Sequence, residues 1–319
     1  MIFEINKNSH IIFIKNDKTK NYIAAIAIGS KHLNDWKKYC FNSWQKYCKK
    51  NNLGLIVIFK DLLNKNSKFW KKPTWQRLLI SKYIKNSNLN IKNICVLDTD
   101  IFINQLAPDI FKNSNLSTVS VVNFYKNLPY NKNDYELRER LVYLRRLFLD
   151  SSYPLRSSLT ASPKEIFKNY KLSKNLNNYF CAGVMVYNVN KYSDFFEKIY
   201  LKYCNKKYSF NGVEIPLNFE LLKKTKLFWL DYKFQTNWLF ELSDKYSFIY
   251  RAKKNKLSLV KICAEEIILN SYFLHFAGTL SDANTAWKIK NFFTDKKLLK
   301  LNNLFNSKKK KLIPKFKKL

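Results

Sequence analysis

Apolar runs alternate with amphipathic stretches over the first hundred residues of the chain. Residues 21–30 (NYIAAIAIGS), 53–61 (LGLIVIFKD) and 93–98 (NICVLD) are almost continuously apolar until they end, which is typical of strands buried on both faces. Residues 35–50 and 73–84 lie between these runs and carry their apolar side chains on one helical face. This β-α-β-α-β order predicts parallel strands in a sheet that helices cover on both faces.

Small or acidic residues close each of the three predicted strands. Gly29, Asp61 and Asp98 fall at the carboxyl ends, and open α/β sheets bind their ligands beyond those ends. Asp100 follows Asp98 by two positions, and residues two apart in an extended chain point to the same side. Two adjacent carboxylates repel each other unless a cation lies between them. Mg²⁺ and Mn²⁺ suit such oxygen ligands and keep positions open for water and substrate phosphates.

The segment 97–100 (LDTD) therefore predicts a divalent-metal site for a phosphorylated ligand. A turn with two solvated aspartates is the alternative, because Asp is common after strands. The longer segment 96–103 (VLDTDIFI) resembles the DxD segment of GT-A glycosyltransferases, especially the family 8-like retaining enzymes. Three further segments resemble the same family in the same order, namely 178–192 (NYFCAGVMVYNVNKY), 212–222 (GVEIPLNFELL) and 272–278 (YFLHFAG).

The resemblance covers about residues 21–290 and implies an α/β fold of the GT-A type. In that fold a mixed, mainly parallel central sheet is flanked by helices. The expected organisation is a single glycosyltransferase domain over residues 1–290, in which residues 111–177 form an acceptor-side insertion. A basic amphipathic tail, residues 291–319, is expected to follow the domain.

The resemblance also implies a set of site residues. Mn²⁺, or Mg²⁺ in its place, is expected on Asp98, Asp100 and His275. Glu214 and Gln235 are the expected catalytic residues near the donor sugar and the acceptor. The residues expected to bind the nucleotide-sugar donor are Ile28, Gly29, Arg77, Asp98, Ala182, Gly183, Gly278 and Lys288.

Most of these residues have an ordinary structural interpretation as well. Gly29 can simply close a turn, Gly183 can serve tight strand packing, and His275 can be a structural histidine after a strand. Arg77 and Glu214 can be solvated surface charges.

Two positions depart from the family pattern. Cys181 stands where the family has an asparagine before Ala-Gly, so the identity of the donor sugar stays open. Lys288 lies further beyond His275 than the family's phosphate-contacting lysine does.

The chain carries a formal net charge of +35, with 58 basic against 23 acidic residues. Such a charge favours anionic partners, namely nucleic acid, anionic lipid or phosphorylated substrates. A composition rich in Lys, Asn and Ile is also what an AT-rich genome produces without selection for binding. A helix is predicted over residues 133–150, and its arginines are expected either to bind an anionic acceptor or to pair with Glu136 and Glu139. These arginines are Arg138, Arg140, Arg145 and Arg146.

Residues 306–319 (NSKKKKLIPKFKKL) interleave lysines with apolar side chains. This pattern suits attachment to an anionic membrane surface, and a disordered solubilising tail is the alternative. No apolar run has the length of a transmembrane span or of a signal-peptide core. The expected location is therefore the cytoplasm, with peripheral attachment to the inner membrane face through residues 308–319.

These features together predict metal-dependent transfer of a hexose from a nucleotide-diphosphate sugar to a hydroxyl of a glycan or glycolipid. The resemblance implies UDP as the nucleotide and retention at the anomeric carbon. Nucleic-acid binding is an alternative of another class, although no groove-reading motif appears and the lysines are spread along the chain. A nucleotidyltransferase would need a Gly-rich phosphate loop after the first strand, where only Gly29 is found. A catalytically inactive relative of the glycosyltransferases is a further alternative.

Overall fold

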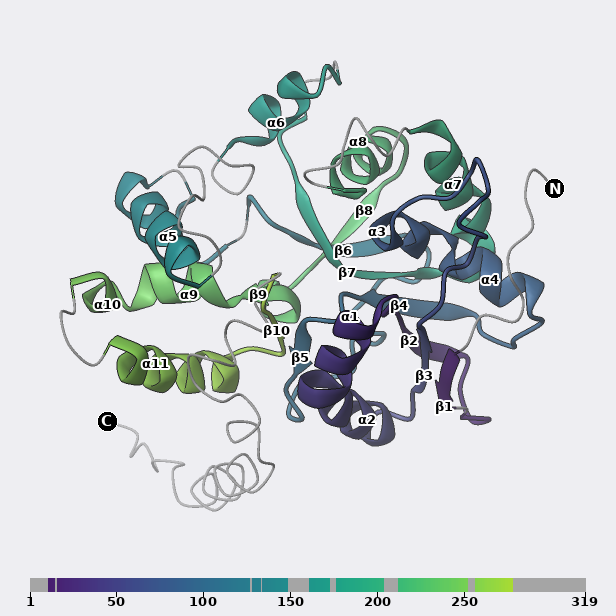
Figure 1. Ribbon diagram of the computed structural model, residues 1–319, viewed down its shortest axis with the longest axis horizontal. Helices are drawn as coiled ribbons and strands as arrows, with labels where there is room; N and C mark the ends of the chain where they lie inside the picture. The colour runs from purple at the N-terminus through teal and green to yellow at the C-terminus, as the bar shows by residue number, and fades with distance from the viewer. Residues whose placement is uncertain are drawn as a thin grey trace, which may run out of the picture.

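The computed structural model describes residues 11–14, 16–126, 128–132, 134–148, 161–172, 176–203, 212–251 and 256–277. Its centre is a seven-stranded sheet in the order β1-β3-β2-β4-β7-β6-β8 (Figure 1). The strands are β1 (Ile11–Ile14), β2 (Asn21–Ile26), β3 (Gly54–Ile58), β4 (Asn93–Leu97), β6 (Val119–Asn123), β7 (Phe180–Asn188) and β8 (Leu227–Leu230).

The three strands predicted from the apolar runs lie side by side as β3, β2 and β4, and β2 pairs in parallel with both neighbours. The predicted mixed α/β sheet is confirmed. Three of its strand pairings are parallel, namely β2–β3, β2–β4 and β6–β8. The other three, β1–β3, β4–β7 and β6–β7, are antiparallel. Because β7 runs against β4, the first half of β7 lies beside the carboxyl end of β4, and Val184 pairs with Leu97.

A second sheet of three short strands joins segments that are far apart in the sequence. It has the order β5-β10-β9, made of β5 (Ile101–Ile103), β10 (Phe273–His275) and β9 (Thr236–Asn237). In its register His275 pairs with Ile101 on one side and with Asn237 on the other. This small sheet therefore carries His275 to the segment that directly follows Asp100.

Helices cover both faces of the central sheet, as the apolar runs predicted. Alternate residues of β2 belong to two separate cores, with Ile23 and Ala25 in one and Tyr22 and Ala24 in the other. The first core packs against α2, and the second against α3, α4, α7 and α8. In Figure 1, α5, α9, α10 and α11 gather at the left of the molecule, away from α4 and α7.

The helices are α1 (Ser30–Asp35), α2 (Phe41–Lys50), α3 (Pro73–Gln76), α4 (Ile80–Asn86), α5 (Tyr135–Phe148), α6 (Pro163–Asn169), α7 (Val189–Lys202), α8 (Glu214–Lys224), α9 (Trp238–Lys245), α10 (Phe248–Arg251) and α11 (Lys256–Asn270). The predicted helix 35–50 is interrupted, because a π-helical turn (η1, Trp36–Cys40) precedes α2. The predicted helix 73–84 is likewise broken by a 3₁₀ turn (η2, Arg77–Leu79) between α3 and α4. Another 3₁₀ turn, η3 (Tyr232–Gln235), precedes β9.

Some predicted features fall beyond what the structure describes. The described residues do not include the predicted basic tail over residues 291–319 or the predicted donor contacts Gly278 and Lys288. They also leave out the side chains of Arg145 and Arg146. The division into a domain and a tail therefore stays a prediction. Within the described ranges, none of the helices combines the length and apolar character needed to cross a bilayer.

Gly54 shows how closely the central strands pack. It pairs with Tyr22 of β2, and a Cβ atom at position 54 would lie 1.9 Å from the Cε1 atom of the buried Tyr22 ring. We expect Gly54→Ala to lower the free energy of unfolding by about 1–3 kcal/mol, because the ring must shift within a filled core. Urea unfolding with an unchanged m-value measures this loss.

A double-mutant cycle identifies the cause of that loss. In a Tyr22→Val background the penalty of Gly54→Ala should shrink, because the obstructing ring is gone. An equal penalty in both backgrounds would show that the ring is not responsible.

Candidate metal centre

The two aspartates of the DxD segment lie in a turn between β4 and β5. The Asp98 amide donates to the Gly183 carbonyl of β7 at 2.9 Å, and the Ile101 amide donates back to the Asp98 carbonyl at 3.2 Å. The Phe276 amide, just after β10, donates to the Asp100 carbonyl at 3.0 Å. The extended geometry predicted for residues 98–100 is therefore wrong, since the chain turns here. Backbone hydrogen bonds to β7 and to the segment after β10 hold the turn in place.

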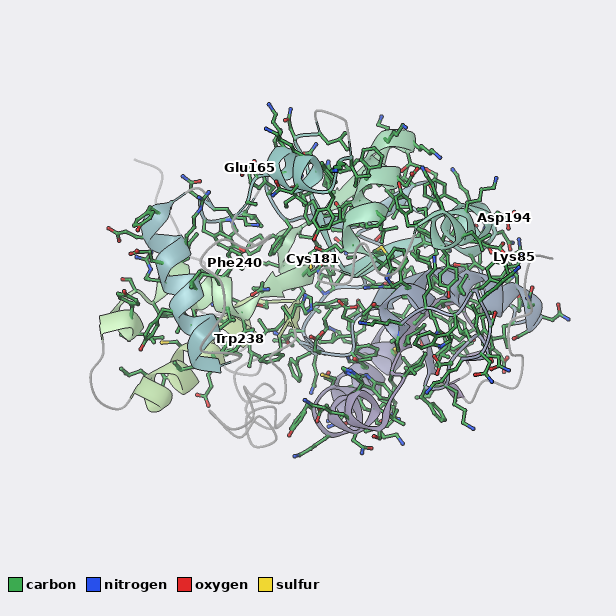
Figure 2. All side chains as sticks on the ribbon, turned by 45° about the horizontal axis from the view of Figure 1, so that its top comes forward. Lys85, Glu165, Cys181, Asp194, Trp238 and Phe240 are labelled. Atoms are coloured by element: carbon green, nitrogen blue, oxygen red, sulfur yellow. The ribbon has the colours of Figure 1, made fainter. Side chains whose placement is uncertain are left out.

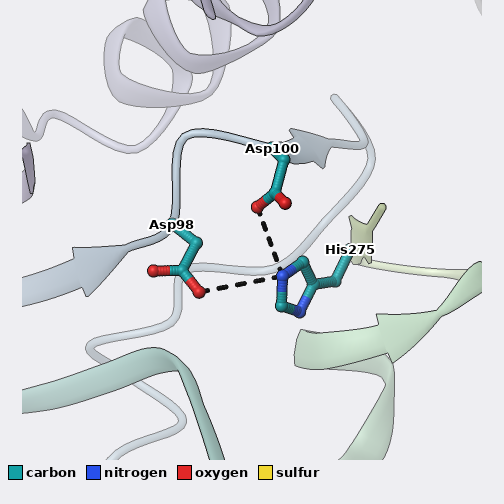
Figure 3. A group of neighbouring side chains, drawn as sticks. All are labelled: Asp98, Asp100 and His275. Carbon is teal, nitrogen blue, oxygen red and sulfur yellow. Dashed lines mark ion pairs between the residues drawn. The ribbon is translucent and has the colours of Figure 1, made fainter. Parts of the chain in front are cut away.

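His275 completes a cluster with these carboxylates (Figure 3). Its Nε2 atom lies 3.2 Å from Asp100 Oδ1 and 3.7 Å from Asp98 Oδ2. The three ligand atoms all lie within 4.8 Å of one another. Adjacent ligands of an octahedral ion with bonds of about 2.1 Å are about 3 Å apart, so the two distances to the imidazole are close to what a small divalent cation needs. The three predicted metal ligands are thus brought together by two segments, the turn between β4 and β5 and the strand β10.

The donor set also matches Mn²⁺ or Mg²⁺ chemically. Two carboxylate oxygens and one imidazole nitrogen leave other positions open for water or phosphate oxygens. The side chain of Asp98 is 37% exposed, whereas the side chain of His275 is 5% exposed. The open side of the cluster therefore lies at the aspartates, and the histidine closes its inner side.

The charges of the cluster are coupled. Burial lowers the pKa of His275, but the charge of Asp100 and its hydrogen bond outweigh burial and raise that pKa well above its ordinary value. Without a bound cation the carboxylates therefore favour the protonated form of the imidazole. A divalent cation at the same place would balance the carboxylates instead.

Arg77 holds the other oxygen of Asp98. Its Nη1 atom donates to Asp98 Oδ1 at 2.8 Å, and its Nη2 atom donates to the Ala182 carbonyl. The residue is only 8% exposed, so the interpretation of Arg77 as a solvated surface charge is wrong. Since the guanidinium occupies Oδ1, the Oδ2 atom of Asp98 is left to face His275.

Glu214 lies at the start of α8 beside β7. Tyr179 Oη donates to its Oε1 atom at 2.9 Å, and the Ala182 amide donates to its Oε2 atom at 3.2 Å. Burial raises the pKa of Glu214, the two donors oppose that rise, and the charge of Asp98 adds to it. Glu214 is therefore an oriented carboxylate whose charge acts on Asp98, and its interpretation as a solvated loop residue is wrong.

Gly183 and Gln235 lie behind the histidine ring. Gln235 is 3% exposed, and its amide group lies 3.3 Å from His275 Nδ1. A Cβ atom at position 183 would lie 2.5 Å from the Gln235 amide and 2.7 Å from His275 Cε1. The absence of a side chain at Gly183 is thus what allows Gln235 and His275 to approach β7.

The residues expected near the nucleotide base lie at the same sheet edge. Ile28 and Gly29 follow β2, whose Ala25 pairs with Leu97 directly before Asp98. Gly29 has a φ of +100° and precedes α1, so it makes a turn that favours glycine. The structural interpretation of Gly29 therefore holds, and it is compatible with the predicted role in binding the base.

The arginines of α5 are engaged within the protein where their side chains are described. Arg140 donates to the Ser243 carbonyl at 2.7 Å and to Glu136 at 3.0 Å, and Arg138 donates to the Lys132 carbonyl at 2.9 Å. These contacts favour the structural interpretation of the arginine helix over binding of an anionic acceptor.

Lys132 is a site-proximal residue that the sequence did not reveal. Its Nζ atom donates to the Phe124 carbonyl at 3.0 Å and lies 4.0 Å from the centre of the Phe124 ring and 5.2 Å from that of Phe240. Burial lowers its pKa to about 7, although the charges of Cys181 and Glu214 oppose that shift. One lysine among 58 basic residues carries no signal in the sequence.

Comparison with known proteins adds a likeness of architecture. No family model matches the chain, and no curated protein matches it. A glycosyltransferase involved in glycosylation of the major capsid of PBCV-1 is 10% identical with a TM-score of 0.46, covering 83% of this chain and 97% of that one. The galactosyltransferase LgtC, in complex with donor and acceptor sugar analogues, is 13% identical with a TM-score of 0.46, covering 85% and 93%. At such identities and TM-scores these likenesses carry no information about substrate or mechanism.

The buried Lys132 leads to a pH-dependent prediction. Its folded pKa lies below the ordinary 10.5, so between about pH 7 and 10.5 the unfolded chain binds a proton that the folded protein does not. The contribution of Lys132 to the free energy of unfolding therefore rises with pH across this window. Relative to Lys132→Met, the wild type should gain about 2–3 kcal/mol between pH 6.5 and 9.5.

Urea unfolding at constant ionic strength measures this difference. The exposed Lys112, changed to Met, is the matched control for the loss of one lysine side chain. A difference between wild type and Lys132→Met that stays constant with pH would contradict the lowered pKa.

Proposed function

We propose that this chain is a metal-dependent glycosyltransferase that moves a sugar from a nucleotide-diphosphate sugar to a hydroxyl of a glycan or glycolipid. The observation that carries the proposal is the convergence of Asp98 Oδ2, Asp100 Oδ1 and His275 Nε2 at the carboxyl edge of the central sheet. That edge is where open α/β sheets bind their ligands. The mixed α/β fold and the order of the sequence motifs also support the proposal.

In this proposal the metal ligands serve the leaving group. A bound Mn²⁺ or Mg²⁺ supplies positive charge that offsets the charge developing on the departing nucleoside diphosphate. Asp98, Asp100 and His275 hold the cation, and Arg77 orients Asp98 through its Oδ1 atom. Ile28 and Gly29 are assigned to the nucleotide base because their strand, β2, ends next to β4. Gly278 and Lys288 stay predicted donor contacts.

Glu214 is assigned to the region of the donor sugar and the acceptor hydroxyl. Its support is the pair of hydrogen bonds from Tyr179 and Ala182, which hold the carboxylate beside β7. A carboxylate fixed in this way can bind a sugar hydroxyl without losing side-chain freedom at that moment. Retention at the anomeric carbon and UDP as the nucleotide rest on the resemblance of the sequence motifs.

The assigned partners follow from charge. A net charge of +35 favours a phosphorylated donor and an anionic surface. We assign residues 308–319 to an anionic membrane face in the cytoplasm, where a lipid-linked acceptor would be found, and we assign no specific nucleic acid. Binding of an anionic polymer through charge alone is the competing function, and it would not depend on Asp100.

Calorimetric titration of UDP tests the proposal. With Mn²⁺ present we expect binding that EDTA abolishes and that Asp100→Asn weakens at least about tenfold, since one charged ligand is lost. Asp194→Asn is the matched control, because it removes one aspartate charge away from the site. Asp194 pairs with Lys85 at 3.7 Å, and both lie far from Cys181, which marks the site in Figure 2. A panel of UDP-sugars then identifies the donor.

Two outcomes would overturn the proposal. Binding that is equal with Mn²⁺ and with EDTA would remove the metal from the mechanism. If neither UDP nor GDP binds under any condition, while DNA binds in a salt-dependent manner, the chain acts through its charge.

A further inference from the structure

The two ring nitrogens of His275 face different surroundings. Nε2 faces the carboxylates of Asp98 and Asp100. Nδ1 faces the amide of Gln235 at 3.3 Å and the Sγ atom of Cys181 at 3.9 Å. A neutral imidazole has one N–H and one lone pair, so the partner of Nδ1 decides whether Nε2 is free to bind a cation.

The backbone of β7 decides how the Gln235 amide is oriented. The amide lies between the Cys181 carbonyl and the Gly183 N–H, and one orientation satisfies both, with Nε2 donating to Cys181 at 2.9 Å and Oε1 accepting from Gly183 at 3.1 Å. The reverse orientation places an oxygen against a carbonyl and an N–H against an N–H. Because Gln235 is 3% exposed, water does not relieve such a mismatch.

This orientation determines the proton on His275. The amide atom that accepts from Gly183 is also the atom 3.3 Å from Nδ1, so the histidine meets an acceptor there. An acceptor at Nδ1 requires an N–H on that nitrogen, which leaves the lone pair of the neutral ring on Nε2. We propose that Gln235 is a positioning residue, which fixes the ring and the tautomer of His275 so that the Nε2 lone pair faces a divalent cation on Asp98 and Asp100.

The proposal rests on the metal role assigned to His275, and it changes the role expected of Gln235. Both ends of its amide are engaged by β7, and its oxygen also faces the histidine. A side chain that is buried and engaged in this way has little left to offer a sugar hydroxyl. The structure thus favours an indirect role over the direct catalytic one predicted from the sequence.

Two further features maintain the arrangement. β9 begins directly after Gln235 and pairs with β10, so that Asn237 lies beside His275. The register of the small sheet therefore keeps Gln235 next to the imidazole ring of His275. Gly183 provides the space, because a Cβ atom there would collide with both the amide and the imidazole. The oriented imidazole is therefore a product of three strands, β7, β9 and β10.

The first test is the affinity of the full chain for Mn²⁺ alone, measured by calorimetry without nucleotide. Gln235→Met keeps the size of the side chain but removes the amide acceptor, and we expect Mn²⁺ to bind about 10–100-fold more weakly. Gln235→Glu in its protonated form keeps both the donor to the Cys181 carbonyl and the acceptor at Nδ1, and it should stay within about threefold of wild type because the tautomer is preserved. Thr236→Val, one residue further along, is the matched control and should bind Mn²⁺ as wild type does.

The second test reads the tautomer directly. The chain has three histidines, so ¹⁵N–¹H correlation spectra of histidine-labelled protein with Mg²⁺ resolve each ring, and His275→Asn assigns the signal. We expect the Nδ1–H form in wild type and in Gln235→Glu, and its loss in Gln235→Met. Gly183→Ala should weaken Mn²⁺ binding as well, and it serves as the second perturbation if Gln235→Met fails to fold.

The outcomes separate this inference from the proposed function. If Gln235→Met and Gly183→Ala bind Mn²⁺ as wild type does and keep the same tautomer, the positioning role is wrong and the proposed function is untouched. If wild type itself fails to bind Mn²⁺, with and without UDP, both the proposed function and the positioning role fall.

Discussion

Repulsion between the carboxylates of Asp98 and Asp100 is the constraint on which the surrounding structure depends. Unit charges within 4.8 Å of each other repel by about 3–4 kcal/mol at an effective dielectric constant of about 20. Arg77 offsets part of that repulsion through Asp98 Oδ1, and a protonated His275 offsets more through Asp100 Oδ1. Asp98 Oδ2 also faces His275 Nε2 at 3.7 Å, and a divalent cation among these three residues would be the natural counter-charge.

The site is assembled by strand order rather than by sequence proximity. β7 runs antiparallel to β4, which places Gly183 beside Asp98 and the Ala182 carbonyl within reach of Arg77. The small sheet then carries His275 to the segment after Asp100. Asp98 and Asp100 lie in a short turn between two strands, and backbone hydrogen bonds to β7 and to the segment after β10 fix its geometry.

Buried polar groups extend the network on both sides of β7. On one side Tyr179 and the Ala182 amide hold Glu214, and on the other Gln235 bridges Cys181 and Gly183 behind the histidine. Lys132 adds a buried amine whose pKa burial lowers to about 7, against the opposing effect of Cys181 and Glu214. Groups of this kind are costly to bury unless they are satisfied, and such a network beside a cluster that could hold a metal ion is typical of a functional centre.

The sequence by itself determined the local features of this protein. The continuous apolar runs identified β2, β3 and β4, because strands buried on both faces cannot alternate in polarity. The DxD segment pointed to Asp98 and Asp100, because carboxylates suit a divalent cation, and the resemblance of residues 272–278 to a known family pointed to His275. Tertiary structure decided the antiparallel insertion of β7, the burial of Arg77 against Asp98, and the place of Gln235 behind His275. It alone buried Lys132, because strand pairing and burial arise between residues far apart in the chain, where no local pattern records them.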